Sequence, residues 1–147
     1  MKVRDTMLIG FAISLASCTT MYEDDAGPLA GTEWGLVSFT SMDDSQGVTR
    51  PTDGQTFTIE FGPDGTAAMQ LDCNRGNASY EAAATSSTSG TITFGPVAAT
   101  RALCPDPKLG DLMAAQLPNV ASYIMNDGKL ALSLKMDGGI FEFESVD

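Results

Sequence analysis

Residues 57–71 read FTIEFGPDGTAAMQL, and this stretch indicates how the whole chain folds. Apolar side chains occupy every second position on both sides of a central turn: Phe57, Ile59 and Phe61 before it, Ala67, Met69 and Leu71 after it. Such alternation is the two-residue period of a half-buried β-strand. The Gly-Pro-Asp-Gly sequence at residues 62–65 has the residue types of a tight turn. The stretch therefore predicts an antiparallel hairpin with one apolar face.

Similar short segments recur on both sides of this hairpin. We expect further strands at residues 33–39, 79–83, 91–94, 120–125, 130–134 and 141–144. Between them we expect turns or loops at residues 41–54, 74–78, 85–90, 126–128 and 136–139. Asn126-Asp127-Gly128 is a strong hairpin pattern, because these residue types accept the backbone angles of tight turns.

One segment has the period of a helix instead. Its apolar residues recur at helical spacing between positions 107 and 117: Leu109, Leu112, Met113 and Leu117. Asp106 is a plausible N-cap, Pro107 suits the first turn, and Pro118 ends the helix. Together these segments predict a mainly β fold, either an antiparallel curled sheet or a small barrel of about eight strands, with one packed α-helix.

The N-terminal residues have the pattern of an export signal. Lys2 and Arg4 precede an uncharged apolar run at residues 7–15, which is too short to span a bilayer permanently. Residues 15–18 (Leu-Ala-Ser-Cys) follow directly and resemble the lipobox of bacterial lipoproteins, in which the cysteine receives lipid. We therefore expect a signal peptide at residues 1–17 and lipid attachment at Cys18. An ordinary signal peptide with a chance cysteine is the alternative.

The acidic and polar residues 18–28 are expected to form a tether between the membrane and a single domain at residues 29–147. Thr19, rather than Asp, follows the expected lipid site, and in many Gram-negative bacteria this favours the outer membrane. We thus expect a lipid-anchored cell-envelope protein that faces the periplasm. Its first partner would be the membrane itself, through the lipid.

Charge and composition restrict the function. Asp and Glu number 19 against 8 Lys and Arg, a net charge of −11, which argues against a nucleic-acid partner. The sequence has no histidine, so Ser-His and Cys-His catalytic pairs and histidine-based zinc sites are excluded. Glu142 and Glu144 alternate outward on a predicted strand and are expected on a solvated face. We expect no enzymatic activity, no metal and no cofactor.

Cys73 and Cys104 remain as a pair once Cys18 is assigned to lipid. Export places them in an oxidising compartment, where a disulfide is the expected state. Closing a loop of about 32 residues would contribute about 3–4 kcal/mol in the chain-entropy model. A redox-active or metal-binding pair is the alternative, although the chain has no Cys-x-x-Cys motif.

Several motifs together resemble the META domain family, the family of the heat-shock-associated lipoprotein HslJ. They are Gly-Thr-Glu-Trp at residues 31–34, Asp-Cys-Asn-Arg-Gly at residues 72–76, Tyr80, and Thr100-Arg101 followed by Cys104. The resemblance covers most of residues 29–145. It implies a barrel-like antiparallel domain with one helix, a place in the cell envelope and a link to stress tolerance or virulence. It implies no reaction.

Five residues near the cysteines form a candidate recognition patch: Asn74, Arg75, Tyr80, Thr100 and Arg101. A disulfide would hold such a patch rigid. The alternative is structural, in which Asn74 stabilises a turn and Arg75 packs beside Tyr80 or an acidic neighbour.

Three functions fit these features. The first is a non-enzymatic envelope lipoprotein of the META type that supports stress or drug tolerance through contacts with an envelope protein or the envelope itself. The second is a lipid-anchored inhibitor of a lytic enzyme such as lysozyme, which is basic and would be attracted by an acidic protein. The third is a carrier that holds a small apolar ligand inside the barrel.

Replacing Cys18 with alanine tests the lipid anchor. Because two or more acyl chains give stable anchoring, the unchanged chain should incorporate labelled fatty acid and stay with the membrane fraction. The Cys18→Ala variant should do neither. Equal incorporation of label into both proteins would contradict the assignment.

Overall fold

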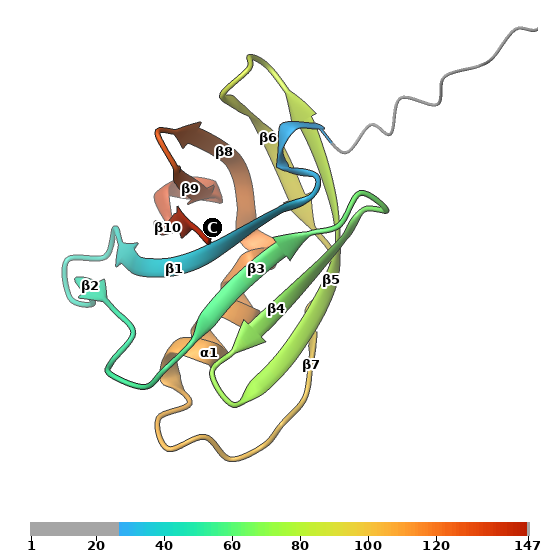
Figure 1. Ribbon diagram of the computed structural model, residues 1–147. Helices are drawn as coiled ribbons and strands as arrows, with labels where there is room; N and C mark the ends of the chain where they lie inside the picture. Colours follow the sequence, from blue (N-terminus) through green and yellow to red (C-terminus); the bar gives the residue numbers. More distant parts are fainter. Residues whose placement is uncertain (1–26, 147) are drawn as a thin grey trace, which may run out of the picture.

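Strand β1 (Thr32–Ser41) pairs with the last strand, β10 (Gly139–Ser145), and this pairing closes the sheet into a barrel (Figure 1). The computed structural model describes residues 27–146. The ring continues through β3 (Phe57–Phe61), β4 (Thr66–Leu71), β5 (Asn74–Ala84), β6 (Ser89–Phe94), β8 (Val120–Asn126) and β9 (Lys129–Leu134). All neighbours in the ring are antiparallel. The predicted eight-stranded antiparallel fold is confirmed.

Two additional strands lie beside the ring. β2 (Val48–Thr49) pairs with the end of β1, inside a segment that was expected to be a loop. β7 (Ala98–Ala99) pairs with the beginning of β5. Strands of two residues are too short to show a periodic pattern, which is why the sequence did not indicate them.

The turn predicted at residues 74–78 is wrong. The chain turns at Asp72 and Cys73 instead, with Asp72 at a φ of 59°, and β5 begins directly at Asn74. Residues 76 and 78 look turn-like because they are small, but Gly76 and Ala78 are buried and face the barrel interior. At Gly76 an added Cβ would lie 3.2–3.3 Å from the side chains of Leu71 and Val97, so a small residue is needed there.

Helix α1 (Lys108–Gln116) packs across one end of the barrel, followed by the 3-10 helix η2 (Leu117–Asn119). The helix begins one residue later than predicted. Pro107 is its backbone cap, while the Asp106 carboxylate accepts a hydrogen bond from the Lys108 N–H at 3.2 Å. Leu109 and Met113 of the helix are buried and cover the apolar interior at this end.

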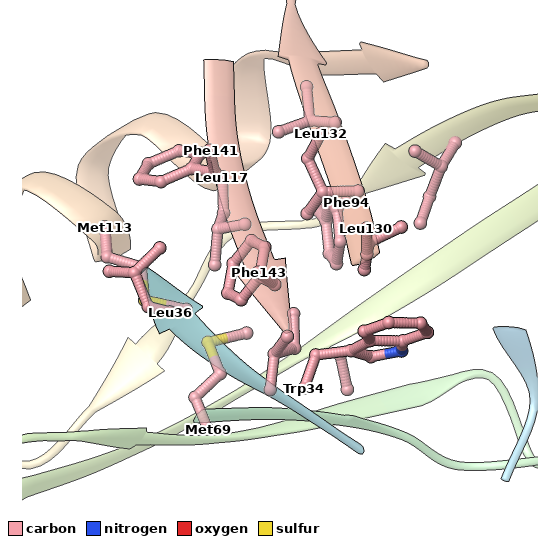
Figure 2. Close-up of a cluster of buried hydrophobic side chains, with 14 of the residues drawn as sticks. Trp34, Leu36, Met69, Phe94, Met113, Leu117, Leu130, Leu132, Phe141 and Phe143 are labelled. Carbon is pink, nitrogen blue, oxygen red and sulfur yellow. The ribbon is translucent and has the colours of Figure 1, made fainter. Parts of the chain in front are cut away.

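Side chains fill the barrel interior, as Figure 2 shows for residues from several strands and α1. Phe39 and Phe141 lie in contact, with ring centroids 4.5 Å apart, and Phe61 and Tyr80 meet edge to face at 5.0 Å. Barrels of eight strands are just wide enough for side chains to fill them. The interior of this barrel is therefore a packed core.

Leu29, on the 3-10 helix η1 (Gly27–Leu29), is fully buried at the end of the barrel opposite α1. Here the Gly31 N–H donates to the Phe61 carbonyl at 2.7 Å, whereas α1 packs near Phe57 at the other end of the same strand. Gly27 and Pro28, expected in the tether, thus belong to the folded domain.

Residues 1–26, which include Cys18 and the predicted signal peptide, lie outside the described residues. No helix within residues 27–146 is long and apolar enough to cross a membrane.

The two ends of the barrel differ in their connections. At the η1 end the strands are joined by short turns at residues 62–65, 85–88 and 127–128. At the α1 end lie the long connections 42–56 and 95–107, the Asp72–Cys73 turn and α1 itself (Figure 1). We call this second end, comprising residues 42–56, 72–73, 95–119 and 135–138, the loop-rich end.

Two buried tyrosines differ in their hydrogen bonding. The Tyr80 hydroxyl donates to the Gly62 carbonyl at 2.6 Å. The Tyr123 hydroxyl, which lies beside Gly90, has no hydrogen-bond partner within residues 27–146. Burial raises the pKa of both phenols, and Asp64 raises that of Tyr80 further. Ionisation of either phenol is therefore disfavoured in the folded state, and stability that is fully present below the ordinary tyrosine pKa of about 10 is lost as the pH rises through the elevated values.

Replacing each tyrosine with phenylalanine should separate these two roles. Tyr80→Phe removes the shorter of the two hydrogen bonds to the Gly62 carbonyl, which keeps only the bond from the Gly65 N–H at 3.3 Å, and should lower the free energy of unfolding by about 1 kcal/mol. Tyr123→Phe removes an unpaired buried hydroxyl and should leave the stability unchanged or raise it. Urea unfolding at neutral pH measures both. A larger loss for Tyr123→Phe than for Tyr80→Phe would contradict this assignment.

Candidate functional site

A disulfide joins Cys73 and Cys104 at the loop-rich end, with their Cα atoms 5.6 Å apart. Cys73 lies in the turn between β4 and β5, and Cys104 lies in the connection that leads to α1. The bond ties this connection to the barrel, as the sequence predicted. Cys73 is exposed to solvent, and Cys104 is half-buried.

The Asn74 side chain makes a second link across the same connection. Its amide Nδ2 donates to the Ala102 carbonyl at 3.1 Å, and its Oδ1 accepts from the Ala102 N–H at 2.7 Å. The Thr100 hydroxyl donates to the same Oδ1 at 3.0 Å. One asparagine side chain thus both donates to and accepts from the backbone of the connection. Asn74 stabilises the connection rather than a turn of its own.

Thr100 completes the link to β5. Its N–H donates to the Arg75 carbonyl at 2.9 Å, and its hydroxyl oxygen accepts from the Arg75 N–H at 3.0 Å. Residues 98–100 therefore pair with the beginning of β5 in an antiparallel ladder. The Arg75 and Arg101 side chains are exposed, and within residues 27–146 neither forms an ion pair.

A groove of about 580 Å³ lies between this connection and α1. One wall is the segment from Ala99 to Cys104, which carries Arg101. The other wall is α1, which presents Gly110, Asp111 and Ala115. Leu103 at the groove edge is fully exposed to solvent. Single exposed apolar side chains are common on protein surfaces, so the groove beside Leu103 is what makes this surface a candidate binding site.

The structure brings together four of the five predicted patch residues: Asn74, Arg75, Thr100 and Arg101. Tyr80 lies elsewhere, because it is six residues further along β5, and a strand rises about 3.3 Å per residue. It is buried and binds the Gly62 carbonyl at the η1 end. Sequence reasoning missed Leu103 and the α1 wall, because a single exposed leucine and a row of small helical residues have no distinguishing pattern.

The cysteine and carboxylate side chains of the described residues form no metal site. Within residues 27–146, no three Cys, Asp or Glu side chains lie close enough together to hold a metal ion. Glu142 and Glu144 are exposed, as expected. Glu142 also accepts a hydrogen bond from the buried Ser38 hydroxyl at 2.7 Å, where the pairing of β1 with β10 shifts register.

Fold and site define a small antiparallel barrel domain whose one loop-rich end is held by a disulfide, an asparagine and a helix. The chain belongs to the META domain family, whose family model matches residues 27–145. None of the curated proteins matches the sequence.

Two solved structures share the fold. One is the NMR structure of a protein from Burkholderia xenovorans, with a TM-score of 0.64, 18% sequence identity and coverage of 99% of this chain and 98% of that one. The other is the crystal structure of a DUF4847 family protein from Bacteroides vulgatus, with a TM-score of 0.53, 16% identity and coverage of 79% and 93%. At these identities the similarity concerns the fold alone.

Removing the two links should have different effects on stability. The Cys73→Ser/Cys104→Ser double variant should lose about 3–4 kcal/mol of unfolding free energy, since the closed loop no longer restrains the unfolded chain. Asn74→Ala removes the side-chain hydrogen bonds to both backbone groups of Ala102 and should cost about 1–2 kcal/mol with the disulfide intact. Urea unfolding measures both losses. An Asn74→Ala protein as stable as the original would show that the amide does not hold the connection.

Proposed function

We propose that this META domain protein is a lipid-anchored, non-enzymatic protein of the cell envelope that supports stress or drug tolerance by binding a protein partner with its loop-rich end. The observation that carries the proposal is the difference between the two ends of the barrel. The described chain starts at the η1 end, so a lipid at Cys18 would attach the barrel at that end, and the loop-rich end would be the end farther from the attachment point. Binding residues are commonly found on loops held by a rigid scaffold.

The loop-rich end also has the surface that a binding role needs. Leu103 is fully exposed there, and Met136, on the connection between β9 and β10, is 97% exposed. The disulfide and Asn74 hold the connection beside Leu103 in one conformation. A pre-ordered loop loses less entropy when it binds, so it binds more tightly for the same contacts.

A matched pair of substitutions in a deletion strain tests the proposal. The gene for the unchanged protein should restore survival under heat and envelope-active drugs. Leu103→Glu at the loop-rich end should not restore it, because a charge would be buried in the interface. Ile124→Glu, at an exposed position on β8 outside the loop-rich end, should restore it fully. A deletion strain with unchanged survival would contradict the proposal.

The acidic charge supports a second candidate function, inhibition of a basic lytic enzyme such as lysozyme. A net charge of −11 would speed the encounter with a basic protein at low salt. A lysis assay decides this directly. The second function is rejected if micromolar protein leaves lysozyme activity unchanged.

A further inference from the structure

The edge of β7 that faces the groove has no partner strand. Within residues 27–146, β7 pairs only with β5, and Gly76 lies opposite Ala99. The neighbouring pair, Arg75 and Thr100, is joined by a backbone hydrogen bond of 2.9 Å. Hydrogen-bonded and non-hydrogen-bonded pairs alternate along an antiparallel ladder. The N–H and C=O of Ala99 therefore point away from β5, on the side where the groove lies.

The groove beside this edge has the shape that an added strand requires. Ala99 itself lines it, and the opposite wall is formed by the small residues Gly110, Ala114 and Ala115 of α1. Small side chains on that wall leave room for a backbone next to β7. Arg101 and Asp111 stand on opposite walls, and Asp72 and Asp106 also line the groove, so three carboxylates and one guanidinium surround it.

We propose that the partner binds by placing an extended segment of its chain in this groove, as a strand added to the free edge of β7. This binding mode rests on the proposed function and specifies how the partner would be recognised. The backbone of Ala99 supplies one donor and one acceptor to the partner's main chain. Small or aliphatic side chains of the segment face α1, and Leu103 covers it from the groove edge.

The position of Ala99 allows a substitution that leaves the hydrogen bonds of the barrel intact. Proline at an outward-facing position of an edge strand removes only the solvent-side donor. Ala99→Pro therefore removes the N–H that the partner would use and leaves the bond between Thr100 and Arg75 in place. Ala99→Val keeps this N–H and is the matched control.

Photo-crosslinking of the full-length chain in living cells is the readout. Leu103 is replaced by p-benzoylphenylalanine, and adducts are compared in the original, Ala99→Val and Ala99→Pro backgrounds. In the original and Ala99→Val backgrounds we expect one adduct with another envelope protein. In the Ala99→Pro background the yield of this adduct should be about tenfold lower, which is the effect of one lost hydrogen bond. Disulfide formation on non-reducing gels confirms that the Ala99→Pro barrel is folded.

A second variant fills the groove from its other wall. Ala115 is exposed on α1, so Ala115→Phe should block the adduct without disturbing the core, whereas Ala115→Ser should not. An adduct equal in all backgrounds would overturn strand addition and leave the proposed function standing. The absence of any adduct, with full tolerance in Leu103→Glu cells, would overturn both. Adducts only between two copies of this chain would also overturn the proposed mode, since the occupant would then be the protein itself.

Discussion

The pairing of β1 with β10 is the interaction on which the rest of the structure depends. It runs from Trp34 opposite Ser145 to Ser41 opposite Gly139 and leaves the ring of eight strands without a free edge. A closed ring hides the edge groups that would otherwise pair with other chains. It also encloses the inward side chains in one apolar core, whose two ends need a cover. Helix α1 covers one end and Leu29 covers the other.

Closure also decides where a partner can bind. Because β1 and β10 are neighbours, the described chain begins and ends at the same end of the barrel, where the Val146 N–H donates to the Glu33 carbonyl at 3.1 Å. The turns at this end are tight. The interior is filled with side chains, so a partner must bind on the outer surface, and the loop-rich end offers a groove beside the edge of β7. β7 keeps a free edge because it is not part of the ring.

Most of the fold could be predicted from the sequence, because alternation of apolar residues reports directly on strands with one buried face. The beginning of β5 could not be predicted in this way. Gly76 and Ala78 face the core but are small, and at Gly76 the side chains of Leu71 and Val97 fill the space that a larger residue would need. The size of Gly76 is thus set by neighbours on other elements, and a local pattern cannot reveal it. The same holds for Asn74, whose partners Thr100 and Ala102 lie far along the chain.

The connection from Ala98 to Leu103 is almost entirely exposed, so burial of apolar surface does not explain its order. Fixing the backbone of one residue costs about 1–2 kcal/mol in entropy. The disulfide at Cys104 and the Asn74 amide offset this cost by polar and covalent links instead. Those links hold Ala99 beside β5 in an antiparallel pairing, with its outer backbone groups toward the groove. A segment kept straight in this way, without help from the core, is suited to pairing with another strand.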